Sequence, residues 1–305
     1  MNSQHPLAGV YAAAVTPLHR EGDPTASVLD LESLPALLHF LARRGCHGAV
    51  LFGTTGEGPS FSPGEREAVM RAACEARDAL PGFRLIAGTG TPSLSESIEL
   101  TRLAFDLGYE AALAVPPYYF RTVTDEGLFH WFSELIRKAV PPDGYILGYH
   151  FPRVVGVGFS IELLKRLKDA FPVQFAGLKD SSHDADLARD LGETFGSDLV
   201  VLTGTDTYLQ LAMQNQAAGC ITALANILSP DLREVWDGLR AGTDISAAQA
   251  RVDQHRHALE KYPPFPPALK SLLHRLHGFP RWSVRPPLED MAPELEDRLA
   301  GEFMK

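Results

Sequence analysis

The strongest candidate for a catalytic residue is Lys179, which follows the apolar run 175–178 (FAGL). A lysine at the end of a buried strand loses hydration, and this loss disfavours the charged ammonium. The neutral amine can attack a ketone to form an iminium, which accepts electrons while an adjacent carbon–carbon bond forms or breaks. A lysine at such a position can also extend to water or pair with Asp180. Its position alone therefore leaves both interpretations open.

Hydroxyl groups follow other short apolar segments. Tyr149 ends the segment 144–149, where it could transfer protons to and from a reacting oxygen, and Thr54 could pass them on. The run 53–56 (GTTG) offers backbone N–H groups and hydroxyls that could hold a carboxylate. The ordinary alternatives are a packed tyrosine with a hydrated hydroxyl and a simple strand-to-helix turn. It is their joint placement that favours a site.

Eight short apolar segments alternate with segments of helical periodicity, a pattern that predicts a closed (β/α)8 TIM barrel. An open, doubly wound sheet is the rival, but the first strand leads into Thr16-Pro17-Leu18 and not into a G-x-G-x-x-G turn. In a barrel of this kind, catalytic residues lie at the carboxyl ends of the strands. The expected strands are 9–15, 48–52, 84–88, 110–115, 144–149, 174–178, 198–202 and 218–222.

Helix signals and prolines define the remaining organisation. Ser62 with Glu65, and Ser93 with Glu96, predict helix starts of the capping-box type, whereas Gly45 and Gly108 predict helix ends. The barrel pattern ends near residue 241. We therefore expect a barrel over 1–241 and a helical extension over 242–305, interrupted by proline pairs and packed on the barrel.

Composition excludes several classes of function. The 305 residues carry a formal net charge of −10 and no long basic run, which argues against a nucleic-acid binder. The apolar stretches are shorter than the ~20 residues of a membrane span. The N-terminal segment has no positive charge before its apolar run, unlike a signal peptide. Three widely spaced cysteines, Cys46, Cys74 and Cys220, make a disulfide framework improbable, so we expect a cytoplasmic protein.

No metal or cofactor motif is evident. The sequence contains neither H-E-x-x-H nor C-x-x-C, and His255 and His257 are spaced to point apart on a helix. His274 and His277 could share a helix face, but no nearby carboxylate completes a ligand set. We therefore expect neither a metal nor a cofactor, and a small molecule as the only substrate.

Several motifs occur together in an order that resembles the dihydrodipicolinate synthase / N-acetylneuraminate lyase family. They are GTTGEG at 53–58, PPYY at 116–119, the spacing Tyr149, Pro152, Gly156, GLKDSS at 177–182, GTD at 204–206 and GCITALAN at 219–226. The resemblance implies a TIM-barrel class I aldolase that works through a pyruvate Schiff base. It also implies a homo-oligomer, usually a tetramer, although a dimer is possible.

The resemblance assigns roles by position. Lys179 would form the Schiff base, Tyr149 would transfer protons, and Thr54 would relay them between Tyr149 and Tyr119, which would come from the adjacent subunit. The residues expected to contact substrate are Gly53 and Thr55 in the carboxylate loop, Ile221 through its carbonyl, Ser181 near the substrate tail, and Gly204 and Asp206.

Departures from the family's motifs bear on the substrate. The synthases carry an arginine two residues after Pro152, where this chain has Val154, with Arg153 one position early. The sialic-acid lyases have Gly-Tyr-Asp-Glu where this chain has Gly-Thr-Asp-Thr at 204–207. The stretch 53–63 is most similar to the 2-keto-3-deoxy sugar-acid aldolases. The lead hypothesis is therefore cleavage or formation of a small hydroxylated 2-oxo acid, with pyruvate as one partner.

Four alternatives remain open. Two keep the Schiff base: condensation of the dihydrodipicolinate synthase type, and hydration, dehydration or decarboxylation of a 2-oxo sugar acid. A third is a non-catalytic protein that binds 2-oxo acids, although such a protein has no need of an iminium-forming lysine. A metal-dependent aldolase is the fourth.

Overall fold

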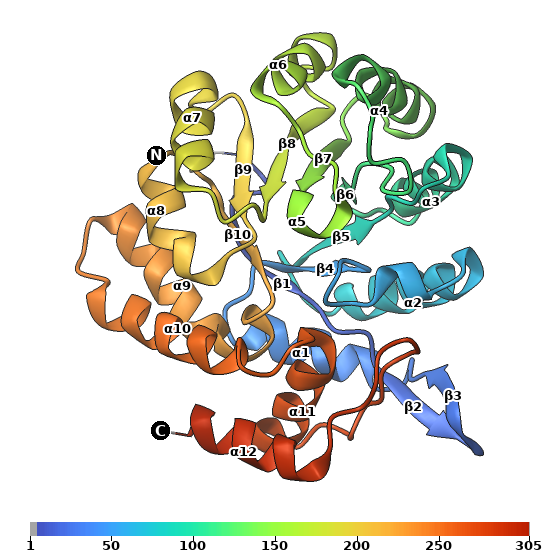
Figure 1. Cartoon of the computed structure of the whole chain (residues 1–305), viewed down its shortest axis with the longest axis vertical. Coiled ribbons are helices and arrows are strands. Elements are labelled where there is room, and N and C mark those ends of the chain that lie inside the picture. The colour runs from blue at the N-terminus through green and yellow to red at the C-terminus, as the bar shows by residue number, and fades with distance from the viewer. Residues whose placement is uncertain (1–4, 305) are drawn as a thin grey trace. The chain divides into compact units, whose positions relative to one another are not determined.

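Eight short apolar segments form the parallel strands of a closed barrel in the computed structural model (Figure 1). The structure describes the backbone of residues 5–304 and the side chains of 5–22 and 26–304. Around the barrel the strands follow the order β1-β10-β9-β8-β7-β6-β5-β4. The bounds are β1 Gly9–Ala13, β4 Gly48–Leu51, β5 Arg84–Gly88, β6 Ala111–Ala114, β7 Tyr145–His150, β8 Phe175–Asp180, β9 Val200–Thr203 and β10 Gly219–Thr222. All eight predicted strands and the (β/α)8 fold class are confirmed.

The strands are short and almost wholly buried, as expected when helices cover a parallel sheet. A helix follows each barrel strand in the chain; after β1, the helix α1 comes only after a hairpin at residues 18–29. The helices are α1 Leu34–Arg43, α2 Pro63–Arg77, α3 Leu94–Asp106, α4 Asp125–Ala139, α6 Ile161–Ala170, α7 Ala185–Phe195, α8 Leu209–Gln214 and α9 Ala225–Ala241. Short helical turns lie at α5 Pro152–Val155, η1 Gly58–Ser60 and η2 Asp206–Tyr208.

The predicted helix signals act where they were expected. Ser62 and Glu65 form a reciprocal capping box at the start of α2, and the Ser93 side chain accepts from the N–H of Glu96. Gly45 and Gly108 have φ of 96° and 78°, which a residue with a side chain rarely adopts, and they follow the ends of α1 and α3.

One element was not predicted. An antiparallel hairpin of β2 Leu18–Glu21 and β3 Asp23–Leu29 lies between the first barrel strand and α1. Its sequence is polar and only four residues make up its first strand, so it lacks the apolar run that identifies the barrel strands. Gly22, with φ of 68°, makes the turn.

The described chain divides into two compact units. The first comprises residues 5–9 and 84–221, and its core includes Phe132, Phe159 and Phe175. The second comprises residues 10–83 and 222–304, and so contains β1, β4, the hairpin and the C-terminal helices. The predicted boundary between a barrel at 1–241 and an extension at 242–305 stays a prediction.

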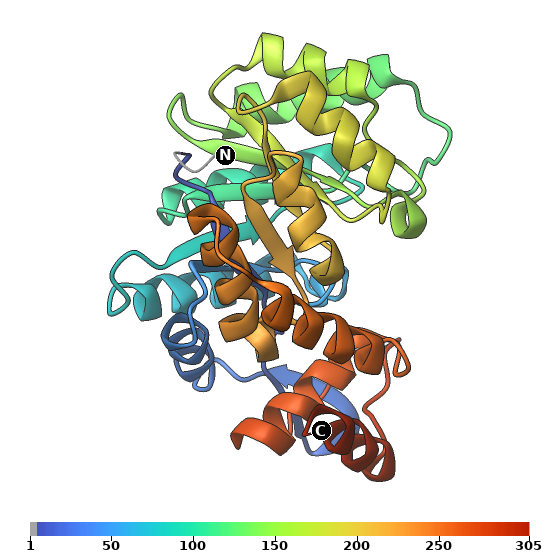
Figure 2. The same ribbon diagram turned by 90° about the vertical axis from the view of Figure 1, so that its left-hand side faces the viewer.

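Three helices follow α9: α10 Ser246–Leu259, α11 Phe265–His277 and α12 Pro293–Phe303. Both views show the C-terminal segment, in red, beside the blue hairpin of the same unit (Figures 1 and 2). Arg20 of β2 forms an ion pair with Asp290, and Arg285 donates to the Ser27 carbonyl of β3. No described helix is long and apolar enough to cross a membrane. The N-terminal segment that was compared with a signal peptide begins at residues 1–4, which lie outside the described residues.

Candidate active site

Lys179 and Tyr149 lie opposite each other on neighbouring barrel strands. Strands β7 and β8 pair in parallel with Tyr149 in register with Lys179, and they run side by side in Figure 1. The Lys179 Nζ atom lies 4.2 Å from the centroid of the Tyr149 ring. Both residues are buried, with 3% and 7% of their surface exposed. Their strands end one residue later, so the pair lies at the carboxyl ends, where barrel enzymes bind substrate.

The Lys179 amine has no hydrogen-bond or ion-pair partner among the described residues. The pairing with Asp180 that the sequence left open does not form: the Asp180 carboxylate instead accepts from the N–H of Ser182. Alternate residues of a strand point to opposite faces, which separates the Lys179 and Asp180 side chains. The structure thus buries an amine beside an aromatic ring and leaves its nitrogen available for chemistry.

The surroundings of Tyr149 hold its strand end in place. The Tyr149 ring stacks on Phe151 with centroids 5.7 Å apart. The next residue, His150, is buried, and its Nδ1 accepts from the N–H of Phe159 at 2.9 Å. Burial lowers the pKa of His150, whereas the charges of Asp180 and Asp184 oppose this shift. An unprotonated His150 Nδ1 therefore anchors the loop that follows Tyr149.

Two further predicted residues meet at the ends of β8 and β9. A side chain at Gly204 would lie 1.9 Å from the Ser181 Oγ, so the glycine makes room for the serine. The Gly204 N–H donates to the Asp180 carbonyl at 2.6 Å and the Ser181 N–H to the His150 carbonyl. Asp206 is fully buried in η2, and Ile221 is fully buried in β10. The first unit thus contains Lys179 and five further predicted residues of the site at or beside its strand ends: Tyr149, Ser181, Gly204, Asp206 and Ile221.

The loop of residues 53–58 (GTTGEG), here called the hydroxyl loop, follows β4 and belongs to the second unit. The N–H of Glu57 donates to the Thr54 carbonyl and the N–H of Gly58 to the Gly53 carbonyl, each at 3.1 Å. Thr54 is exposed, whereas Thr55 is buried. Within residues 5–304, the N–H groups of Thr55 and Gly56 donate to no protein atom. Successive backbone N–H groups of a turn that donate to no protein atom can bind a small anion.

Tyr119 occupies a different environment from the other predicted residues. It is 78% exposed and its ring packs edge-on against Phe120, itself 72% exposed, at 5.2 Å. Two adjacent exposed aromatic rings are unusual on a monomer surface and typical of a surface that another chain covers.

No group of three or more potential metal ligands occurs among the described residues. None of the three cysteines, all within the described residues, forms a disulfide. Burial raises the pKa of the Cys46 thiol to about 12, which makes it unreactive at neutral pH.

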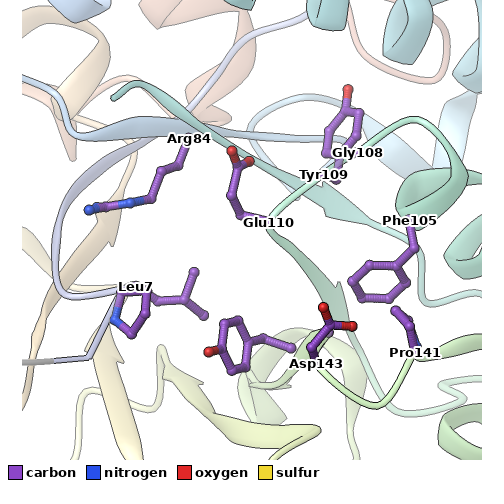
Figure 3. Close-up of a pocket in the computed structure, with 11 residues that line it drawn as sticks. Leu7, Arg84, Phe105, Gly108, Tyr109, Glu110, Pro141 and Asp143 are labelled. Atoms are coloured by element: carbon purple, nitrogen blue, oxygen red, sulfur yellow. The ribbon is translucent and has the colours of Figure 1, made fainter. Parts of the chain in front are cut away.

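A separate cavity of about 370 Å³ opens in the first unit (Figure 3). Arg84, Glu110 and Tyr145, which line it, lie where β5, β6 and β7 begin. These are the amino-terminal strand ends, whereas Lys179 lies at the carboxyl ends. Because barrel enzymes carry out catalysis at the carboxyl ends, this cavity is not part of the candidate active site.

Comparison with known proteins decides the family. The family model described as the dihydrodipicolinate synthetase family matches residues 6–302. The chain belongs to this family. It is 36% identical to an uncharacterized DapA-like lyase of Chloroflexus aurantiacus, over 94% of this chain and 92% of that protein. It is 34% identical to the 4-hydroxy-tetrahydrodipicolinate synthase of Thermus thermophilus, over 89% of each chain. The crystal structure of dihydrodipicolinate synthase from Agrobacterium tumefaciens superposes with a TM-score of 0.86 at 32% identity, covering 97% of this chain and 98% of that one.

The resemblance that the motifs indicated is therefore confirmed, and the protein is an enzyme of the class I aldolase and lyase type. Sequence reasoning attached no role to three charged residues around the hydroxyl loop, namely Glu57, Lys270 and Arg285. Lys270 does carry a signal, because it is the one charged residue in the leucine-rich helix segment ALKSLL at 268–273. A charge at a core position of a helix predicts a buried partner.

Proposed function

We propose that this member of the family is a pyruvate-dependent aldolase that cleaves or forms a small hydroxylated 2-oxo acid of the 2-keto-3-deoxy sugar-acid type. The observation that carries the proposal is the buried Lys179 amine, 4.2 Å from the Tyr149 ring and without an ionic partner among the described residues. An amine held this way can act as a nucleophile, whereas an amine paired with a carboxylate cannot.

In the cleavage direction, the Lys179 amine adds to the C2 carbonyl of the 2-oxo acid, and loss of water gives an iminium. Tyr149 removes the proton of the C4 hydroxyl, the C3–C4 bond breaks, and its electron pair moves to the iminium as an enamine. An aldehyde leaves. Protonation of C3 and hydrolysis then release pyruvate and restore the amine, so one substrate yields two products with no net redox change.

The hydroxyl loop would hold the carboxylate of the 2-oxo acid. Thr55 with the N–H groups after Gly53 supplies donors, and the exposed Thr54 would relay protons. The Ile221 carbonyl would line the pyruvate pocket. The exposed Tyr119 would act in the site of an adjacent subunit, which calls for a homo-oligomer, a tetramer or a dimer.

Two features favour a neutral, hydroxylated substrate tail. Val154, at the position where the synthases carry an arginine, is 53% exposed and apolar. Ser181, Gly204 and Asp206 gather polar groups at the ends of β8 and β9 instead, which suits hydroxyls. Separately, the three cysteines of the described chain form no disulfide, which fits a cytoplasmic enzyme.

The test is borohydride trapping with pyruvate, read by intact mass and peptide mapping. We expect one adduct, on the peptide that contains Lys179. Folded protein that gives no adduct would exclude the Schiff-base mechanism and favour a protein that only binds 2-oxo acids. Products from 2-keto-3-deoxygluconate then separate cleavage, which yields pyruvate, from dehydration, which yields a 2-oxo acid with all its carbons.

Condensation of the synthase type is the second candidate. The Thermus thermophilus relative carries that name, and Arg121 packs against the loop after Tyr149, since a side chain at Gly156 would lie 2.8 Å from the Arg121 Cδ. Arg121 could therefore bind a second carboxylate in place of the missing arginine. Turnover of pyruvate with aspartate semialdehyde, lost in Arg121→Met and kept in Arg153→Met, would favour this candidate.

A further inference from the structure

The hydroxyl loop contains one residue, Glu57, in an unfavourable backbone conformation. Glu57 has φ of 56°, a left-handed conformation that costs free energy in a residue with a side chain. Gly58 is also required, because a side chain there would lie 2.1 Å from the Phe52 carbonyl oxygen. The Glu57 N–H closes the turn onto the Thr54 carbonyl. The position of Glu57 therefore determines the shape of the turn that carries Thr54 and Thr55.

A fully buried ion pair holds Glu57. The Lys270 Nζ of α11 lies 2.5 Å from the Glu57 Oε1, and both side chains are 0% exposed. Lys270 also donates to the Ser283 carbonyl at 2.7 Å, and the Arg285 N–H donates to the Glu57 Oε2 at 2.8 Å. Both carboxylate oxygens are thus bonded to the C-terminal part of the chain, more than 210 residues away in sequence.

The Arg285 side chain reinforces the same connection. Its guanidinium donates to the Glu65 carboxylate at 2.6 Å and to the Ser60 carbonyl at 3.3 Å, and lies over the Phe61 ring. The Arg66 guanidinium, from the first turn of the following helix α2, donates to the Gly58 carbonyl. The loop is therefore held on its carboxyl-terminal side by charged groups with fixed geometry.

A buried ion pair is a poor source of stability, because desolvation of the two charges offsets most of their attraction. Burial lowers the pKa of the Lys270 ammonium, and the Glu57 carboxylate opposes that shift. Apolar side chains would fill the same space at lower cost. What they cannot supply is direction, since charge-assisted hydrogen bonds fix the positions of their atoms more narrowly than apolar contacts do.

We propose that Glu57 and Lys270 are positioning residues, which set the shape of the hydroxyl loop so that Thr54 and Thr55 meet the carboxylate of a 2-oxo acid. This inference rests on the proposed function, because it assigns the carboxylate to that loop. Neither residue takes part in the covalent chemistry. Their loss is therefore expected to weaken binding of the 2-oxo acid while Lys179 still forms the iminium.

The test is the double variant Glu57→Gln/Lys270→Met, which removes both buried charges and approximately keeps the volume. Borohydride trapping is measured over a range of pyruvate concentrations, well below the melting temperature. We expect the half-saturating pyruvate concentration to rise by about 10-fold or more, since a misplacement of 1 Å can cost far more than that. At saturation, the adduct on Lys179 is expected to reach the wild-type amount.

The matched control is Arg256→Met/Glu260→Gln. Arg256 of α10 is also buried and paired at 2.8 Å, in the same unit, but with a carboxylate outside the hydroxyl loop. The half-saturating pyruvate concentration of this control variant should equal that of the wild type. A purely structural role for Glu57 and Lys270 predicts a lower melting temperature with unchanged half-saturation, and that result would overturn the proposal.

Two outcomes need separate readings. If the double variant does not fold, Glu57→Asp decides, because it keeps both charges and shortens the carboxylate by one methylene. A raised half-saturating concentration then supports the proposal, and an unchanged one overturns it. If the wild-type enzyme itself gives no adduct on Lys179, the proposed function fails instead.

Discussion

Two buried lysines, one in each compact unit, differ in what surrounds the nitrogen. Lys179 is 3% exposed and its Nζ faces the Tyr149 ring, with no ionic partner among residues 5–304. Lys270 is 1% exposed and its Nζ contacts the Glu57 carboxylate and the Ser283 carbonyl. Burial alone therefore does not distinguish a reactive lysine from a structural one. The partner does.

The difference follows from where each lysine lies. Lys179 lies at the end of a barrel strand, where its Nζ faces the Tyr149 ring and no carboxylate of the described residues neutralises it. Lys270 lies in the middle of α11, where an unpaired ammonium would be prohibitively costly. An unpaired buried amine costs stability, so its presence in the fold supports a functional role.

The largest effect is expected when Lys179 is replaced. Lys179→Met is expected to abolish turnover, by on the order of 10⁴-fold or more as for other covalent catalytic residues. It should leave the melting temperature unchanged or higher, because it removes a buried amine that has no ionic partner. Steady-state kinetics and a thermal melt check both. An active Lys179→Met enzyme would end the distinction between the two lysines.

Tyr149→Phe tests the aromatic neighbour of the reactive lysine. The ring contact remains, so borohydride trapping at Lys179 should persist, whereas turnover should fall by about 10²–10⁴-fold with the loss of the proton-transfer hydroxyl. Tyr262→Phe is the control, because the Tyr262 hydroxyl binds Glu302 in the other unit. Equal rates for Tyr149→Phe and the wild type would show that the proton shuttle lies elsewhere.

Lys270→Met tests the structural lysine. It leaves the Glu57 carboxylate buried without its cation, which should cost about 3–5 kcal/mol of the free energy of unfolding. The measurement is urea unfolding followed by circular dichroism. Lys261→Met is the control, because its ion pair with Glu302 lies at the surface and should contribute almost nothing measurable. A small loss for Lys270→Met would mean that water reaches the Glu57 carboxylate.

His5 is a third base in a mostly apolar environment, and it extends the comparison to pH. Burial, with the charges of Lys168 and Arg84, lowers the pKa of His5 to about 4 from its usual 6.5. Between these values the unfolded state binds the additional proton, so stability falls as the pH is lowered from about 6.5 toward 4. The His5 Nδ1 accepts from the Leu7 N–H, a bond that protonation would break.

Urea midpoints measured across this pH range for His5→Gln check that expectation. The variant should lose part of the wild-type decline, since glutamine does not titrate. Identical pH profiles would show that other groups account for the decline, and that protonation of His5 does not change the free energy of unfolding.

Much of the fold could be predicted because its signals are local. A run such as FAGL at 175–178 is apolar enough to be a buried strand whatever surrounds it, and the Ser62 capping box acts within one helical turn. The hairpin at 18–29 was missed because it lacks such a run. Its pairing depends on Gly22 and on contacts with the C-terminal segment, as between Arg285 and Ser27.

The candidate site divides in the same way. The eight-fold alternation puts Lys179 and Tyr149 at strand ends, and the motifs assign their roles, so both could be proposed from residue types and order. The role of Glu57 could not, although it lies within a motif that the sequence displays. Its partner Lys270 lies 213 positions away, and no local pattern links two residues so far apart.

The sequence by itself therefore determined the barrel and the family, and it led to the proposal for the Lys179 amine, because strand runs, helix caps and motif order are properties of neighbouring residues. Only the tertiary structure decided which buried lysine has a carboxylate partner and which residues hold the hydroxyl loop. It also decided that the Asp180 carboxylate accepts from the Ser182 N–H and does not pair with Lys179. These depend on which distant groups the folded chain brings within hydrogen-bonding distance, and on the desolvation that makes each such contact matter.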